Sequence, residues 1–199
     1  MWGVENGSDE IRRIVNNSSI DIHQDNPADE LNYLGDVSVP NTKWYGYPTC
    51  YTIWKPSDFT DKAFAVGDQF VLAPNETFSD ETCKTKSEPA RLAFQAHSAP
   101  LDAKFDPAFE NLFIAFHGSW NRAPLPQGGY NVVFVPFTGD APMNGEYEIF
   151  ADGFAGQTPL MERNDATYRP SGVAEGPDGS LYIANDKTGR IWRVMYQGD

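Results

Sequence analysis

The chain has 199 residues, with 15 Lys and Arg against 28 Asp and Glu, and a formal charge of −13. The length suits one domain or part of a larger all-β domain, and with 40% hydrophobic and 14% aromatic residues intrinsic disorder is excluded. The negative charge argues against nucleic acid and membrane surfaces as partners, and no apolar run approaches the roughly 20 residues of a membrane helix.

Only two segments of the whole chain suggest helices, and the rest is expected to form short β-strands and loops. Asp9–Asn17 and Pro27–Leu34 are expected to form short ones, the second after the turn signal Asp25-Asn26-Pro27. The segment from about residue 55 to residue 88 has weak periodicity and is rich in Asp, Thr, Ser and Lys. We expect it to be a long insertion on the rim of the domain.

The second half of the chain reads as short β-strands separated by turn residues. Apolar or alternating runs typical of strands occupy Leu112–Phe116, Tyr130–Phe137, Tyr147–Phe150, Val173–Ala174, Leu181–Ala184 and Ile191–Tyr196. Residues 177–180 and 187–189 carry the Gly and Asp signals of the turns that separate the last three.

A faint internal repeat organises these strands. Residues 97–135 and 169–194 each contain a first strand, a strand that ends in a polar residue (His117 or Asp186), and a strand with aromatics. Units of three to four strands predict propeller blades. The whole chain, 1–199, is expected to be a C-terminal portion of about two and a half to three blades that begins partway through a blade. A sandwich of about ten strands is the competing fold.

Cysteines and glycosylation signals point to an oxidising compartment. Cys50 and Cys83 either form one disulfide or are two unrelated buried thiols. Four Asn-x-Ser/Thr sequons begin at residues 6, 16, 17 and 75. We expect secretion, although no basic and then apolar leader follows Met1.

The string His117-Gly-Ser-Trp-Asn-Arg122 is the strongest candidate site. A His and an Arg at the end of a strand can bind a carboxylate, Trp120 offers a stacking face and Asn121 can fix orientation. His97 and Arg169 open the first strands of their repeats and are expected to face the axis, His97 near His117. The pattern suits a planar, anionic ligand, whereas the structural alternative is a loop histidine with a packing tryptophan.

Acidic residues near the N-terminus could hold a metal. The string from Asp25 to Asn32, with Glu5 upstream, offers the hard oxygen ligands that calcium prefers. A helix cap with Asp25 at the N-terminus explains the string equally well. No paired-cysteine zinc motif, nucleophile elbow or phosphate-binding glycine loop is present in the sequence.

Taken together, these strings resemble a known family. Trp2-Gly-Val-Glu-Asn-Gly7, the Asp25–Asn32 string, Tyr45-Gly-Tyr-Pro48, His97-Ser-Ala-Pro100, His117–Arg122 and Arg169-Pro-Ser-Gly172 occur in that order. The chain resembles the C-terminal half of the L-sorbosone dehydrogenase-like proteins, relatives of the soluble pyrroloquinoline-quinone (PQQ) glucose and pyranose dehydrogenases. The Cys50–Cys83 insertion resembles that of the secreted fungal branch.

The resemblance implies a six-bladed β-propeller that binds PQQ and calcium and oxidises a sugar hydroxyl or sugar aldehyde, passing electrons to an external acceptor. By motif position, His97, His117 and Arg169 would contact PQQ; Trp120, Asn121 and Arg122 would line the cofactor or the substrate mouth; Glu5 would bind metal. In the family the catalytic base lies upstream of residue 2, so this chain alone is expected to be inactive.

Two other classes of function remain open at this stage. One is a calcium-dependent propeller hydrolase of the lactonase type, in which His97 and His117 act on a lactone without a redox cofactor. The other is a non-catalytic propeller fragment that binds carbohydrate. A bound quinone absorbs in the near ultraviolet, and this absorbance would distinguish a PQQ-dependent dehydrogenase from both alternatives.

Overall fold

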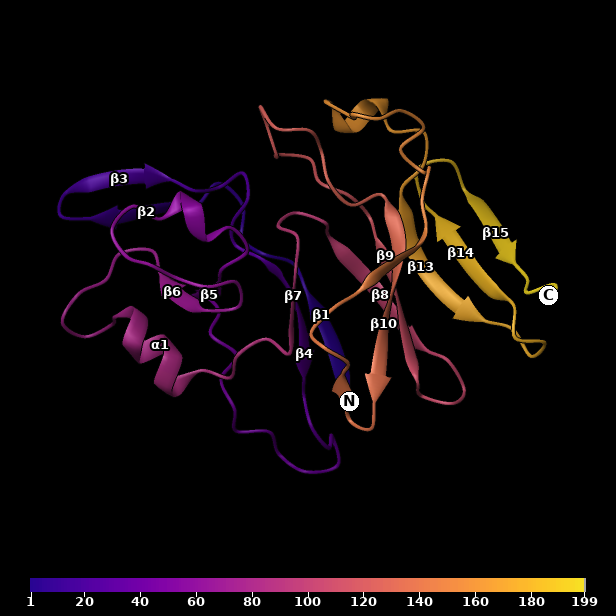
Figure 1. Cartoon of the computed structure of the whole chain (residues 1–199), viewed down its shortest axis with the longest axis horizontal. Coiled ribbons are helices and arrows are strands. Elements are labelled where there is room, and N and C mark those ends of the chain that lie inside the picture. Colours follow the sequence, from indigo (N-terminus) through magenta and orange to yellow (C-terminus); the bar gives the residue numbers. More distant parts are fainter. Residues whose placement is uncertain (199) are drawn as a thin grey trace. The chain divides into compact units, whose positions relative to one another are not determined.

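The computed structural model describes residues 1–198. The chain folds as two compact units: unit 1 comprises Met1–His97 and Asn121–Leu125, and unit 2 comprises Ser98–Trp120 and Pro126–Asp199. Both units consist of antiparallel strands with little helix (Figure 1), which confirms the all-β prediction. No helix within residues 1–198 is long and apolar enough to cross a membrane.

Unit 1 contains a three-stranded sheet and two hairpins. The sheet has the order β1 (Trp2–Glu5), β4 (Asp29–Tyr33), β7 (Leu92–Phe94), and the hairpins pair β2 (Arg12–Val15) with β3 (Ser18–Asp21) and β5 (Cys50–Thr52) with β6 (Gln69–Val71). A short 3-10 helix, η1 (Pro56–Asp58), and helix α1 (Asp80–Lys86) follow β5 and β6. A core cluster in this unit consists of Ile11, Ile22, Ile53, Phe59 and Phe70.

Both helices expected in the first third of the chain are wrong. Residues 12–21 form the β2–β3 hairpin, whose turn residues Asn16 and Asn17 have φ of 50° and 61°, the backbone that a two-residue hairpin turn requires. Residues 29–33 form β4, which pairs with β1 on one side and β7 on the other. Four of its five residues are buried, so sheet pairing outweighs the helix-cap signal of the acidic string.

The segment from residue 55 to residue 88 is more regular than expected. It contains β6, which pairs with β5, and α1, whose N-cap Ser79 forms a capping box with Thr82. Cys83 on α1 and Cys50 on β5 form a disulfide. The segment therefore contributes its own strand and helix to unit 1.

Unit 2 consists of two antiparallel sheets. The first contains β8 (Pro100–Phe105), β9 (Asn111–Phe116), β10 (Asn131–Thr138), β11 (Ala141–Pro142) and β12 (Glu148–Ala151), with β8, β9, β10 and β12 running as a four-stranded meander. The second contains β13 (Pro170–Glu175), β14 (Leu181–Asn185) and β15 (Arg190–Val194). A 3-10 helix, η2 (Arg163–Asp165), precedes β13.

The six strands expected in the second half of the chain are confirmed as β9, β10, β12, β13, β14 and β15. Apolar residues from both sheets share one core, with Ala115 and Val132 from the first packed with Val173 and Ile183 from the second. A four-stranded meander is the unit of a propeller blade. The number of blades stays a prediction.

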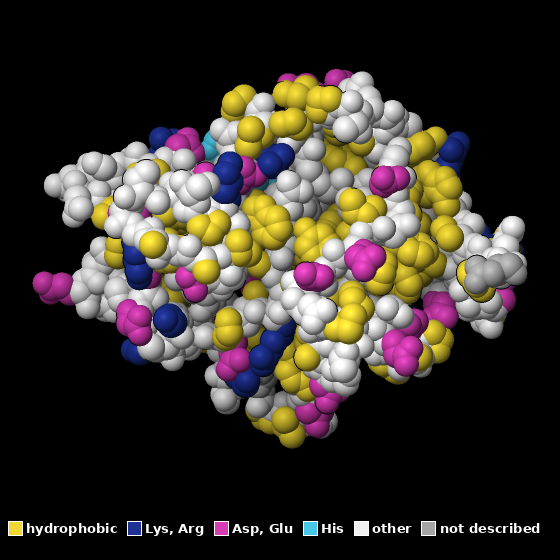
Figure 2. All heavy atoms as spheres, viewed as in Figure 1, with side chains coloured by type: hydrophobic (Ala, Val, Ile, Leu, Met, Phe, Trp, Pro, Cys, Tyr) yellow, Lys and Arg dark blue, Asp and Glu magenta, His cyan; other side chains and the backbone are white. Residues whose placement is uncertain are grey.

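Charged side chains are interspersed on the face drawn in Figure 2. Acidic side chains (magenta) are scattered among hydrophobic and uncharged ones, and Lys and Arg (dark blue) lie between them. This face therefore carries both signs of charge.

Candidate functional site

Arg169 in unit 2 is fixed by hydrogen bonds from both its backbone and its side chain. It precedes β13, and its backbone N–H donates to Asn185 Oδ1 at 2.7 Å. Its Nε donates to the His117 carbonyl at 3.1 Å and its Nη2 to the Gly118 carbonyl at 2.6 Å, with the guanidinium 5.5 Å from the centre of the Tyr130 ring. Within residues 1–198 no carboxylate forms an ion pair with it. We name Arg169, His117 and Asp186 the Arg169 site.

His117 is oriented by an acidic residue that the sequence analysis did not assign to the site. Its Nε2 lies 3.0 Å from each carboxylate oxygen of Asp186. The two residues follow β9 and β14, and the internal repeat places them at equivalent ends of their strands. The repeat therefore held the signal that would have identified Asp186.

The loop after His117 is held in a conformation that requires glycine. Gly118 has φ of +92°, and a Cβ at this position would lie 2.4 Å from the Tyr130 ring. The Tyr130 hydroxyl donates to the Ser119 carbonyl at 2.5 Å, which fixes the next residue. Trp120 follows with 48% of its surface exposed, and the Arg163 guanidinium lies 5.6 Å from its ring. This tryptophan presents aromatic surface to solvent, as a stacking residue must.

His97 lies in unit 1, where both ring nitrogens have partners. It is 6% exposed; its Nε2 hydrogen-bonds the His23 carbonyl, and its Nδ1 lies 3.4 Å from Asp9 Oδ1. A carbonyl only accepts, so Nε2 carries the proton. Burial lowers the pKa of His97 below its usual range. Asn121, also in unit 1, donates from Nδ2 to the same Asp9 oxygen at 2.8 Å.

Arg122 forms a buried ion pair with Asp25 in unit 1. Its Nε and Nη2 donate to Asp25 Oδ1 at 3.0 and 2.5 Å, and Lys55 Nζ donates to Asp25 Oδ2 at 2.8 Å. Burial opposes ionisation, but the hydrogen bonds from Lys55 and Arg122 hold the pKa of Asp25 below its usual range. Asp25 therefore caps no helix, and its carboxylate is already paired with two cations, Arg122 and Lys55. Its pairing joins residues 97 positions apart, which no local pattern indicates.

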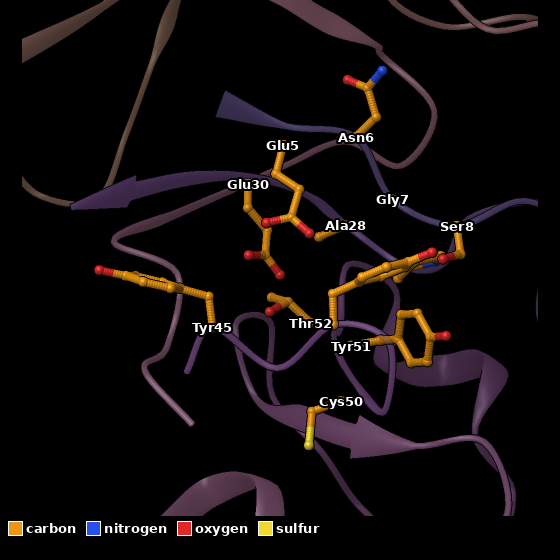
Figure 3. Close-up of a pocket in the computed structure, with 12 residues that line it drawn as sticks. Glu5, Asn6, Gly7, Ser8, Ala28, Glu30, Tyr45, Cys50, Tyr51 and Thr52 are labelled. Carbon is orange, nitrogen blue, oxygen red and sulfur yellow. The ribbon is translucent and has the colours of Figure 1, made fainter. Parts of the chain in front are cut away.

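Glu5 lies in a small pocket with a second glutamate (Figure 3). Register between β1 and β4 places Glu5 opposite Glu30, and Asn32 Nδ2 donates to both carboxylates, at 3.3 and 2.9 Å. Burial raises the pKa of Glu30, and burial followed by the charge of Glu30 raises the pKa of Glu5. We name Glu5, Glu30, Asn32 and Thr52 the carboxylate pocket. The sequence analysis grouped Glu5 with the string that contains Glu30 and Asn32, and it missed Thr52.

Some of the predicted site residues are in contact within one unit, and others lie in different units. His117 and Arg169 meet in unit 2, and Asn121 lies on the carboxylate that faces His97 in unit 1. His97 and His117 belong to different units, so their expected proximity stays a prediction. Within residues 1–198 no group of three or more His, Cys, Asp or Glu side chains is arranged to hold a metal ion.

Comparison with known proteins places these features in a family. The chain matches the TrAA12-like family over residues 1–197. It is 38% identical to a PQQ-dependent pyranose dehydrogenase of Coprinopsis cinerea, over 98% of this chain and 28% of that protein. Its fold matches the holo form of the Coprinopsis cinerea pyranose dehydrogenase PQQ domain, with a TM-score of 0.78, 36% identity and coverage of 96% of this chain and 49% of that one.

A calcium structure of a Trichoderma reesei enzyme of carbohydrate-active enzyme family AA12 is also similar. It aligns with a TM-score of 0.81 and 35% identity, over 96% of this chain and 47% of that chain. The chain thus spans between about a quarter and a half of the proteins and domains that it matches. The family match covers nearly every residue, and the chain belongs to the TrAA12-like family.

Proposed function

We propose that the full-length protein that carries this chain is a quinoprotein oxidoreductase that oxidises a sugar hydroxyl or sugar aldehyde with PQQ and passes the electrons to an external acceptor. Membership of the TrAA12-like family and the similarity to PQQ-dependent dehydrogenases support the proposal. The chain covers only part of those relatives, so the proposal concerns the full-length protein.

The observation that carries the proposal is the guanidinium of Arg169. Two backbone carbonyls fix it, and no carboxylate within residues 1–198 neutralises it. A fixed arginine is preorganised for a carboxylate, to which it can donate in a bidentate manner. PQQ is a planar tricarboxylate, so the donor set fits one of its carboxylates. Nη1 forms no hydrogen bond within the described chain and is the nitrogen we assign to this contact.

His117, Trp120 and the residues of unit 1 have more limited proposed roles. Asp186 accepts the Nε2 proton of His117 and fixes its ring, which leaves Nδ1 to face a ligand. Trp120 offers a stacking surface to a planar group or a sugar ring. His97, Asn121 and Arg122 are kept as cofactor-binding residues by motif position, although each already has a partner in unit 1.

When bound, PQQ supplies a two-electron acceptor, and calcium supplies a Lewis acid beside it. The residues of this chain would bind and orient the cofactor. The Arg169 guanidinium would bind one of its carboxylates, and the Asp186 carboxylate keeps a proton on His117 Nε2. The general base is proposed to lie outside residues 1–199, so that the isolated chain has no activity. The chain is proposed to form two and a half to three blades of a six-bladed propeller, with residues 55–88 as a rim insertion.

The environment of the protein is proposed to be extracellular. The disulfide between Cys50 and Cys83 supports an oxidising compartment, because such bonds persist there and are reduced in the cytosol. Sugars from outside the cell would then be the substrates.

Absorbance spectroscopy tests the proposed reaction. The full-length apoprotein is reconstituted with PQQ and calcium, and pyranoses are added without an acceptor. The proposal predicts that the near-ultraviolet absorbance of the quinone changes when a pyranose is added and returns when an electron acceptor follows. An unchanged quinone spectrum with every pyranose would refute it, and lactone hydrolysis by the same sample without PQQ would identify a lactonase instead.

A further inference from the structure

The loop that precedes β13 is fixed against the Arg169 site. Leu160 and Ala166 of this loop are buried in one apolar cluster with Tyr130, and the Tyr130 ring is the one that the Arg169 guanidinium faces. Lys187 Nζ donates a hydrogen bond to the Ala166 carbonyl. The 3-10 helix η2, the short orange coil in Figure 1, lies between these two anchors of the loop. Its backbone is therefore held in place near the proposed contact with the cofactor.

Gln127 ties the loop that carries Trp120 to the same segment. Ser119 Oγ donates to Gln127 Oε1 at 2.7 Å. The Gln127 backbone N–H donates to the Leu160 carbonyl at 2.7 Å, and its Nε2 donates to the Met161 carbonyl at 3.3 Å. Trp120 directly follows Ser119, and η2 begins two residues after Met161. A single side chain thus connects the loop of Trp120 to the loop of η2.

Arg163 on η2 is an exposed cation beside Trp120. Its guanidinium lies 5.6 Å from the centre of the Trp120 ring, within the range of a cation–π contact. Acidic residues flank Arg163 in sequence, but none forms an ion pair with it within residues 1–198. Arg193, in contrast, also lies against an aromatic ring but is paired with Asp178. In a chain with a formal charge of −13, a guanidinium without a carboxylate, beside an exposed aromatic ring, favours an anionic ligand.

Positive charge extends from Arg163 to Arg169. Burial raises the pKa of the Tyr130 hydroxyl, whereas the charges of Arg169 and Arg163 act in the opposite direction. Both guanidinium groups therefore lie within electrostatic range of one hydroxyl. Arg169 is assigned to a carboxylate of PQQ, so the guanidinium of Arg163 remains for a second anionic group.

A uronate combines the two features that this pair of side chains recognises. It is a pyranose that carries a carboxylate on a ring carbon. The exposed aromatic surface of Trp120 suits the apolar face of the sugar ring, and the Arg163 guanidinium suits the carboxylate, to which it can donate two hydrogen bonds. A neutral pyranose would use only the aromatic half of the pair.

We propose that Trp120 and Arg163 bind the substrate and select a pyranose that carries a carboxylate, a uronate, over the corresponding neutral pyranose. The inference rests on the proposed function and adds the class of substrate to it. Trp120 contributes to the binding of both kinds of sugar, whereas Arg163 is the residue that determines the preference.

Steady-state kinetics with paired substrates test the preference. The full-length protein, reconstituted with PQQ and calcium, is assayed with galacturonate against galactose and with glucuronate against glucose, using one electron acceptor throughout. We expect kcat/KM for the uronate to exceed that for the neutral sugar by at least about tenfold in one of the pairs, the effect of one hydrogen bond to a charged group. Added salt should lower this ratio, because it screens an exposed ion pair.

Three variants assign the preference to one side chain. Arg163→Gln should lower the ratio to about one, and Arg163→Lys, which keeps the charge but loses the two-pronged contact, should give an intermediate ratio. Arg193→Gln removes the same charge from an arginine that Asp178 already neutralises, and it should leave the ratio unchanged. Calorimetric titration should show that Arg163→Gln binds PQQ as tightly as the wild type, and circular dichroism checks that each variant is folded.

Equal kcat/KM values for uronate and neutral sugar in the wild type, or the same ratio in Arg163→Gln as in the wild type, would overturn the inference. Weaker PQQ binding by Arg163→Gln would also overturn it, because Arg163 would then bind the cofactor. Oxidation of pyranoses without a preference for uronates leaves the proposed function intact. Oxidation of no pyranose would overturn both, so the two failures are distinguishable.

Discussion

Arg13 is the charged side chain whose loss should damage unit 1 most. It is 1% exposed and donates to Asp61 at 2.7 Å, to Asp80 at 2.9 and 3.0 Å and to the Val71 carbonyl at 2.6 Å. The guanidinium also lies 5.7 Å from the ring centre of Phe59. Arg13→Met keeps most of the volume but leaves Asp61 without this cation and Asp80 with only the Lys62 ammonium, 3.6 Å away. Breaking a buried pair in this way costs about 3–5 kcal/mol.

The neighbouring residue provides a matched control. Arg12 pairs with Asp21 at 2.9 Å, but the two side chains are 54% and 44% exposed, so Arg12→Met should cost at most about 1 kcal/mol. The free energy of unfolding is measured by urea denaturation, followed by tyrosine and tryptophan fluorescence. Equal losses in the two variants would refute the claim that burial of the Arg13 pairs sets their contribution.

The remaining predictions concern the backbone, the crosslink and pH. Gly118→Ala should destabilise unit 2 by about 1–3 kcal/mol, because Cβ would overlap a tyrosine ring at positive φ, whereas Gly179→Ala, at positive φ in open space, should cost at most about 1 kcal/mol; equal costs in urea melts would contradict this. Replacing Cys50 and Cys83 by serine, 33 positions apart, should remove about 3–4 kcal/mol by chain entropy, and an unchanged melt would contradict it. Asp25 has a lowered folded-state pKa, so its stabilisation is present above its unfolded pKa of about 3.9 and is lost as the pH falls through the folded value. Asp25→Asn should flatten that acid limb, and an equally steep limb would count against the pairing.

Strand patterns predicted unit 2 well because its strands are apolar runs bounded by turn residues. Leu112–Phe116 and Tyr130–Phe137 became β9 and β10 within a residue or so at each end. Unit 1 was harder, because β4 carries Asp29, Glu30 and Asn32 at buried positions. A buried strand with three polar residues has no hydrophobic pattern, and only its cross-strand partners explain it.

Which residues belong to the candidate site was easier to predict than which residues they contact. The string that begins at His117 and the position of Arg169 were evident from the sequence, and the structure joins them through backbone carbonyls. Asp25 was considered as a metal ligand or helix cap, but its partner Arg122 is too distant in sequence to be inferred. Long-range pairs of this kind depend on the folded chain path rather than on local pattern.

Binding of PQQ tests the central claim most directly. Calorimetric titration of PQQ into the full-length protein, with calcium present, compares the wild type with Arg169→Ala and with Arg91→Ala, an exposed arginine elsewhere in the chain. We expect calcium-dependent binding of PQQ that Arg169→Ala weakens by at least about tenfold, because a charge-assisted contact of about 1.5–3 kcal/mol is lost. Arg91→Ala should leave the affinity unchanged. Equal affinity in all three proteins, or no binding by the wild type, would contradict this claim.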